Sequence, residues 1–175
     1  TGTILAGGEV FTVTQAAGTT SSANALVNGD FESGSAGWTQ AARSGTIISS
    51  GSANAHAGSG YAWLGGYNNA LDNLHQVVTI PSTAQSAVVR FWYLIETQET
   101  LSTAFDNLSL TIRDAITGNT LATLAQLSNA NATFGWVQSP SFDVSAFKGM
   151  TVRLQFAATT DASLLTNFLV DDVTL

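Results

Sequence analysis

The chain has 175 residues, and 45% of them are hydrophobic while only 10% are charged. An average soluble domain carries about 25% charged residues, so most of this surface must consist of Ser, Thr, Asn, Gln and Gly. The net charge of −7 and the five Lys and Arg residues argue against binding to nucleic acid or an anionic membrane. No apolar run approaches the roughly 20 residues that insertion into a membrane requires.

The composition also bears on where the protein works. The sequence contains no cysteine, which excludes a disulfide scaffold, and the low charge is common in exported bacterial modules. The chain starts with Thr1 rather than Met and shows no signal peptide. We therefore expect a processed piece of a longer protein that is secreted or at the cell surface, covalently linked to a neighbouring domain.

Residues 1–25 differ from the rest of the chain. Gly7-Gly8 can turn a small hairpin between residues 3–5 and 10–13, and residues 16–25 are small and polar like a linker. The hairpin either packs on the following domain or belongs to a preceding one, and its apolar residues favour packing. We assign residues 1–25 to this hairpin or linker.

Residues 26–175 read as one all-β domain. Short runs rich in Val, Thr, Ile and Phe alternate with Gly, Asn, Ser and Asp, which is typical of many short strands. The predicted strands are Leu74–Ile80, Ala87–Glu96, Asn107–Arg113, Thr120–Leu124, Gly135–Phe142, Thr151–Ala157 and Phe168–Leu175. So many strands with so little helix predict an antiparallel β-sandwich of the jelly-roll type.

Local patterns add detail to this prediction. In Thr151–Ala157 the alternation places Val152, Leu154 and Phe156 inward and Arg153 and Gln155 outward. Residues 114–119 suit a hairpin turn in which Gly118 and Asn119 can take positive φ. Residues 144–149 suit one helical turn that ends at glycine.

Two acidic motifs lie at opposite ends of this domain. Asp30 and Glu32 follow Asn28 near its start, and Asp171 and Asp172 stand among apolar residues at its close. An unpaired carboxylate in such surroundings costs several kcal/mol. A hard cation shared by the first and last strands would remove this cost, because calcium takes carboxylate and carbonyl oxygens.

Several motifs recur in the same order in a known superfamily. They are Leu26–Gly34 with Gly37-Trp38, His56–Tyr67, Val77–Pro81, Phe91–Tyr93, Ala104–Leu108 and Phe168–Val173. With them the chain resembles the galactose-binding-like jelly rolls, in particular the carbohydrate-binding-module-like accessory domains of secreted bacterial peptidases and glycoside hydrolases. The opening and closing motifs are also similar to the MAM domain, whose cysteines are missing here.

The resemblance implies a structural Ca²⁺ that joins the first and last strands. Its expected side-chain ligands are Glu32 and one of Asp171 and Asp172, with Asp30 and the carbonyl of Asn28 as additions. Strand alternation cannot decide which of the two aspartates binds the ion. Neighbouring residues face opposite sides of the sheet, and a bulge would reverse which of them faces the ion. The alternative is that these acids are solvated residues at strand ends.

No constellation points to catalysis. His56 and His75 are the only histidines and lack zinc-ligand spacing, so both read as ordinary surface residues. No Gly-x-Ser-x-Gly elbow is present. Glu96 and Glu99 are the best carboxylate pair for glycoside hydrolysis, but they read as a polar loop, with Asp106 nearby, that contacts a ligand or a second cation. We expect no enzyme.

Aromatic side chains are the usual contacts for sugar rings. Trp92 and Tyr93 are adjacent on a strand and must point to opposite faces, while Trp38 and Trp63 are expected to be buried. The remaining candidates form a weak ligand-binding set, together with the two glutamates: Tyr67, Asn68, Trp136, Glu96 and Glu99.

The sequence thus favours a non-catalytic, calcium-stabilised accessory module that binds glycan or another extracellular polymer. Such a module holds a linked domain near its substrate. The alternative is a structural or interaction domain of a secreted peptidase or adhesin with no small ligand. Two or more solvent-facing aromatic rings beside polar loops would favour the first hypothesis.

Overall fold

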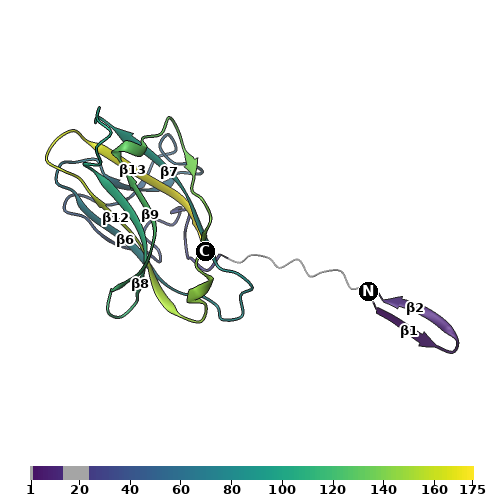
Figure 1. The fold of residues 1–175 in the computed structure, drawn as a ribbon. Coiled ribbons are helices and arrows are strands. Elements are labelled where there is room, and N and C mark those ends of the chain that lie inside the picture. Colours follow the sequence, from purple (N-terminus) through teal and green to yellow (C-terminus); the bar gives the residue numbers. More distant parts are fainter. Residues whose placement is uncertain (1, 14–23) are drawn as a thin grey trace.

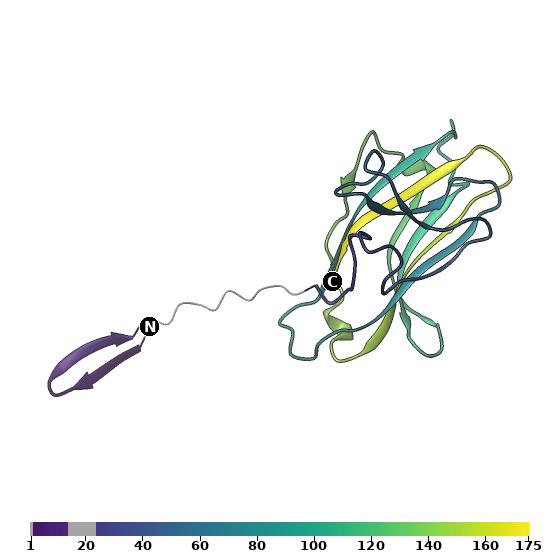
Figure 2. The same cartoon turned by 180° about the vertical axis from the view of Figure 1, so that it is seen from behind.

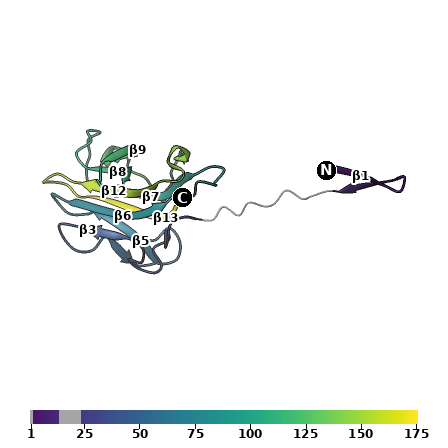
Figure 3. The same cartoon turned by 90° about the horizontal axis from the view of Figure 1, so that it is seen from below.

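The computed structural model of the protein describes residues 2–13 and 24–175 (Figure 1). Residues 24–175 form two antiparallel sheets that pack face to face (Figure 3). The first, called the β7–β13 sheet, has the order β10 (Val137–Gln138), β7 (Val88–Thr97), β13 (Thr166–Thr174), β5 (Gly60–Gly65) and β4 (Ile48–Ser50), and β11 (Phe142–Asp143) also pairs with β7.

The second sheet, called the β6–β12 sheet, contains five strands. Its order is β3 (Thr39–Ala41), β6 (Leu71–Thr79), β12 (Thr151–Thr159), β8 (Asn107–Asp114) and β9 (Thr120–Ser128). Figure 2 shows the same fold from behind, with strand β13 in yellow. The predicted all-β sandwich is confirmed. None of the helices in the described residues is long and apolar enough to cross a membrane.

The predicted N-terminal hairpin is present. Strands β1 (Gly2–Ala6) and β2 (Glu9–Val13) pair antiparallel, and Gly7 and Gly8 both adopt the positive φ that their turn needs. Most of the linker expected at residues 16–25 lies outside the described residues. The division of the chain at residue 25 stays a prediction.

The core lies between the two sheets and follows the alternation of the sequence. Val152, Leu154 and Phe156 of β12 are buried as predicted, and the Phe156 ring packs edge-on against Phe91 of β7 with centroids 5.2 Å apart. Gln155 occupies an outward position but is only 6% exposed, since its Nε2 donates to Asn73 Oδ1 at 2.9 Å on the neighbouring strand.

Most of the expected strands appear within a few residues of their predicted bounds, with one correction. Gly135–Phe142 is not one strand but two short ones, β10 and β11, which Pro140 separates because proline has no N–H for the ladder. The expected helical turn is the 3₁₀ helix η2 (Ser145–Phe147), and a second one, η1 (Asn129–Asn131), was not predicted. In the 114–119 turn Gly118 takes positive φ, whereas Asn119 does not.

The beginning and end of the sandwich lie side by side and share backbone hydrogen bonds. The N–H of Ala25 donates to the Leu175 carbonyl at 2.7 Å, and the N–H of Val173 donates to the Gly29 carbonyl at 2.8 Å. Asn24 Oδ1 accepts from the N–H groups of both Leu26 and Leu175. We call these contacts the terminal clasp. It closes the domain at the place where the acidic motifs lie.

The clasp leaves no room for a side chain at Gly29. A Cβ there would lie 2.0 Å from the carbonyl oxygen of Val173, which is backbone and cannot rotate away. We predict that Gly29→Ala lowers the free energy of unfolding by about 1–3 kcal/mol, measured by urea denaturation. Gly51→Ala is the matched control, because a Cβ there meets nothing within 4 Å. Equal stability of the two variants would contradict the role of the clasp.

Candidate functional site

The two acidic motifs meet at one loop, formed by residues 56–60 and called the His56–Gly60 loop. Asp171 Oδ2 accepts hydrogen bonds from the N–H groups of His56 at 2.9 Å and Ala57 at 3.4 Å. Glu32 Oε1 accepts from the N–H groups of Ser59 and Gly60, both at 2.6 Å. Carboxylates from opposite ends of the domain thus hold the two halves of the same loop.

The electrostatic environments of these two carboxylates differ. The backbone N–H groups of Gly60 and Ser59 lower the pKa of Glu32. Asp171 is fully buried, and burial, together with the charge of Asp172, raises its pKa to about 6 although backbone N–H groups oppose the shift. Asp171 is therefore a buried acid whose ionised form is not fully compensated.

Asp172 points elsewhere because the chain is irregular here. It has a positive φ of 48°, and the register of β13 against β7 shifts between Asp171 and Thr174. Its Oδ2 lies 2.6 Å from His56 Nδ1, within hydrogen-bond distance. The bulge that complicated the sequence prediction is present, and both aspartates reach the His56–Gly60 loop.

His56 is not the ordinary surface residue that the sequence suggested. Its ring stacks on Trp92 with centroids 3.9 Å apart and meets the edge of Trp136 at 5.7 Å. This packing follows from Trp92 facing outward on β7, whereas the adjacent Tyr93 packs against the core. The prediction that Trp92 and Tyr93 occupy opposite faces is confirmed.

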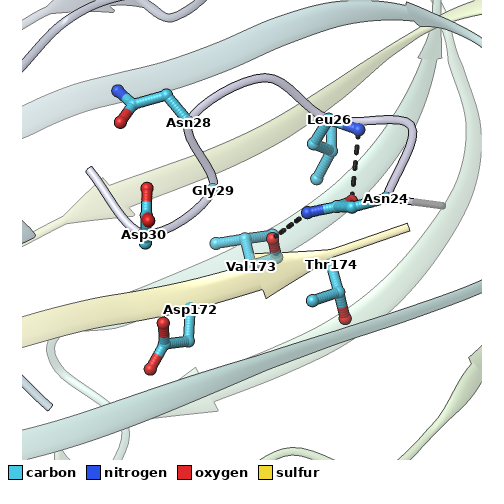
Figure 4. Close-up of a pocket in the computed structure, with 8 residues that line it drawn as sticks. All are labelled: Asn24, Leu26, Asn28, Gly29, Asp30, Asp172, Val173 and Thr174. Atoms are coloured by element: carbon cyan, nitrogen blue, oxygen red, sulfur yellow. Dashed lines mark hydrogen bonds between the residues drawn. The ribbon is translucent and has the colours of Figure 1, made fainter. Parts of the chain in front are cut away.

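The other predicted metal ligands line a shallow pocket of about 220 Å³ beside the terminal clasp (Figure 4). Asn28, Asp30 and Asp172 border it, with Gly29 between the first two. The Asn28 carbonyl already accepts from Trp38 Nε1 at 2.9 Å. Among the predicted ligands, Glu32 and Asp171 therefore contact the His56–Gly60 loop, Asn28 and Asp30 border the pocket, and Asp172 does both.

The fit of these residues to Ca²⁺ depends on which oxygen atoms converge on one point. Across residues 2–13 and 24–175, no three His, Cys, Asp or Glu side chains stand in position to hold one metal ion. The available donors are nevertheless all oxygen, which is the calcium preference, and buried Asp171 forms no ion pair within the described part of the chain. Glu32 and Asp171 are thus oxygen donors of the kind that calcium takes, and the groups of the His56–Gly60 loop that contact them are N–H donors.

A second feature lies on the outer face of the β7–β13 sheet. It is a groove of about 250 Å³, called the Trp63 groove, with lining residues Ala53, Asn54, Tyr61, Trp63, Leu94, Glu96, Asn167 and Leu169. Leu169 of β13 pairs with Trp63 on one side and Leu94 on the other. Asn167 lies opposite Glu96. The strand register thus places the apolar side chains of Trp63, Leu169 and Leu94 next to the polar pair Asn167 and Glu96.

The exposure of Trp63 corrects the sequence prediction. Trp38 is buried as expected, but Trp63 is 42% exposed, because its neighbours Ala62 and Leu64 take the inward positions of β5. Its indole Nε1 donates to Asn167 Oδ1 at 3.0 Å, which fixes the ring over the groove. Strand alternation alone could not have shown this exposure, because Tyr61 occupies the same face of β5 and is only 4% exposed.

The weak ligand-binding set is not brought together. Glu96 lines the Trp63 groove, Trp136 contacts His56, and Glu99 follows β7. Tyr67 and Asn68 lie in the loop after β5, where the Tyr67 hydroxyl donates to Asp72 and Asn68 Nδ2 donates to the Ala162 carbonyl at 3.0 Å. Burial and Asp72 raise the pKa of Tyr67.

No family model matches the chain, and no curated protein matches it significantly. Solved structures do match. The module TmCBM61 in complex with β-1,4-galactotriose is 19% identical, with a TM-score of 0.64, over 87% of this chain and 97% of that one. The Family 16 Carbohydrate Binding Module-2 is 20% identical, with a TM-score of 0.54, over 86% and 98%.

The K2 adhesin domain of Lys-gingipain also matches, at 17% identity and a TM-score of 0.53, over 82% of this chain and 95% of that domain. The chain has the jelly-roll fold of these modules. The resemblance inferred from the ordered sequence motifs is thus confirmed at the level of the fold.

The raised pKa of Asp171 predicts a pH dependence of stability in calcium-free buffer. Its folded pKa of about 6 lies above its ordinary value of 3.8, so the folded state holds this proton more tightly. The protonated Asp171 therefore adds to the free energy of unfolding below pH 4, and this stabilisation is lost as the pH rises toward 6. Thermal unfolding with chelator should therefore show a steeper decline over this range in wild type than in Asp171→Asn. Parallel curves would contradict the assignment.

Proposed function

We propose that this chain is a non-catalytic accessory module of a secreted or cell-surface protein, and that it binds neutral glycan in the Trp63 groove. The observation that carries the proposal is the exposed indole of Trp63, fixed by Asn167 beside two outward leucines. A half-exposed Trp on a sheet face offers the flat apolar surface on which a pyranose ring stacks. An apolar surface with a few convergent polar groups is the usual form of a ligand site.

The polar side of the groove supplies the groups that recognise hydroxyls. Glu96 has an exposed carboxylate that forms no ion pair within the described part of the chain, and Asn54 and Asn167 add amide groups. Asn54 Nδ2 donates to the Tyr61 hydroxyl at 3.1 Å, which orients it. A sugar ring that stacks on Trp63 would therefore meet both donors and acceptors.

The charge of the groove sets the class of glycan. The protein carries a net charge of −7, and Glu96 adds a negative group to the groove itself. Two like charges 4 Å apart repel by about 1 kcal/mol in water and more where water is excluded. The groove therefore favours neutral polysaccharides over those that contain uronic or sialic acids.

The fold matches support a binding role without establishing one, because a fold hosts many functions. Two of the matching structures are carbohydrate-binding modules by name, and one of them contains galactotriose. As a tethered module, this domain would raise the effective concentration of glycan near a linked domain. In the same proposal Ca²⁺ is a structural ion at the His56–Gly60 loop.

A protein-docking role is the second candidate. It is favoured by the match to the K2 adhesin domain. Under this alternative the Trp63 groove would not bind sugar.

Replacement of Trp63 tests glycan binding. Trp63→Ala removes the stacking surface, and aromatic contacts contribute about 0.5–1.5 kcal/mol beyond the area they bury, so we expect affinity to fall about tenfold or more. Binding is measured by titration with neutral oligosaccharides that a glycan array identifies. Trp136→Ala is the matched control because Trp136 does not line the groove.

A complementary variant tests the charge argument. Glu96→Gln should retain binding to neutral glycans and gain binding to uronate-containing ones. If Trp63→Ala binds every glycan as tightly as wild type, or if the array shows no binding, the glycan proposal is wrong and the docking role is favoured.

Calcium is tested separately by thermal unfolding with excess Ca²⁺ and with chelator. A ligand present at about 1,000 times its Kd and bound only to the folded state adds roughly 4 kcal/mol, which corresponds to several degrees in Tm for a domain of this size. We expect Glu32→Gln to lose the part of this rise that an ion at the His56–Gly60 loop contributes, whereas the matched charge change Glu9→Gln keeps the whole rise. An identical rise in wild type and Glu32→Gln would contradict the proposed ion at the His56–Gly60 loop.

A further inference from the structure

A second group of acids lies at the other end of β13, where three chain segments meet. The loop of residues 98–106 follows β7, the loop of residues 160–165 precedes β13, and η1 lies beside them. Gln98 donates its N–H to the Leu165 carbonyl at 2.9 Å. Asn129 of η1 accepts from the N–H groups of Phe105 and Asp106. These bonds hold the three segments together.

Asp106 is the centre of this group, and its environment is unusual. It is 0% exposed. Its Oδ1 accepts from the N–H of Asp161 at 2.8 Å, so the carboxyl group points at the 160–165 loop. Its Oδ2 is buried and has no hydrogen-bond partner among the described residues. A buried polar group without a partner costs about 1–3 kcal/mol, and more when charged.

The other fully buried acids, in contrast to Asp106, have hydrogen-bond partners for both carboxylate oxygens. Asp72 accepts from the Gly65 N–H with one oxygen and from the Tyr67 hydroxyl with the other. Both oxygens of Asp171 accept backbone hydrogen bonds. Only Asp106, among the buried acids of the described chain, keeps an oxygen that nothing satisfies.

Two more acidic residues, Asp161 and Glu99, lie near Asp106 without a compensating base. Asp161 lies on the facing loop, and Glu99 is close enough that, after burial, the charges of Asp161 and Asp106 raise its pKa. No Lys or Arg of the described chain forms an ion pair with any of the three. Up to three negative charges therefore gather where the fold has provided no positive one.

We propose that Asp106, Asp161 and Glu99 form a second cation site, which takes Ca²⁺ with Asp106 Oδ2 as its innermost ligand. Ca²⁺ binds six to eight oxygens in flexible geometry, which suits carboxylates on loops better than the strict octahedron of Mg²⁺ does. Asp161 has one oxygen engaged by Ser163, and its other oxygen is free to bind the ion.

The site also predicts a local rearrangement. Three acidic side chains do not yet converge anywhere in residues 2–13 or 24–175. Asp106 is fixed by its burial, so the adaptable member is Glu99, which lies on a loop and is partly exposed. Its side chain turns toward Asp106 when the ion binds, and the 98–106 loop is then fixed against the 160–165 loop.

This site is distinct from the ion proposed at the His56–Gly60 loop. Thr166 begins β13 next to the Asp106 group, and Asp171 lies five residues further along the same strand. At about 3.4 Å per residue the two sites are separated by roughly 17 Å. Each can therefore be removed without touching the other.

The test is calorimetric titration of the full chain with CaCl₂. We expect two calcium equivalents for wild type. The double variant Glu99→Gln/Asp161→Asn should lose one equivalent or bind it at least tenfold more weakly, while Glu32→Gln keeps that equivalent. Neither substituted residue is buried, so the variant should fold, which circular dichroism checks. Glu9→Gln is the matched control for the loss of charge.

Each outcome decides between the two sites. If Glu99→Gln/Asp161→Asn binds calcium as wild type does, the Asp106 site is wrong. If wild type binds one ion and Glu32→Gln removes it, the Asp106 site is also wrong and the ion at the His56–Gly60 loop stands. If wild type binds one ion that only the double variant removes, the Asp106 site stands and the ion at the His56–Gly60 loop is wrong. The absence of any calcium binding overturns both.

Discussion

The domain depends on the contact between its first and last segments. The terminal clasp joins Ala25 to Leu175 and Gly29 to Val173 through backbone hydrogen bonds, and the carboxylates of Glu32 and Asp171 then hold the His56–Gly60 loop from both sides. The loop in turn carries His56 against Trp92 on the outer sheet face. One set of contacts therefore closes the sandwich and shapes the surface next to the Trp63 groove.

Much of the fold could be predicted from the sequence because strand alternation is a local property. Val152, Leu154 and Phe156 face the core as their spacing requires, and Gly118 turns the predicted hairpin. The strand expected at residues 135–142 failed at Pro140, whose missing N–H interrupts the ladder. The sequence alone was also unable to show that Gln155 would be buried, since this depends on Asn73 of a neighbouring strand.

The candidate sites were harder to predict because they are made by pairs distant in sequence. The two acidic motifs were found as charges among apolar residues, and their meeting follows from the antiparallel topology. Which backbone groups they bind could not be foreseen, because the His56–Gly60 loop has no periodicity. Trp63 was assigned to the core on the strength of its motif, whereas its position between Ala62 and Leu64 places it outward.

The adjacency of residues 25 and 175 has a mechanical consequence (Figure 1). A force that pulls the two ends of the sandwich apart would act first on the Ala25–Leu175 hydrogen bond and would reach the buried rings of the core only after the terminal clasp had opened. The bonds of the clasp would break one after another rather than all at once. Resistance to tension would then rest on the hydrogen bonds of Glu32 and Asp171 to the His56–Gly60 loop, which links the first and last segments behind the clasp.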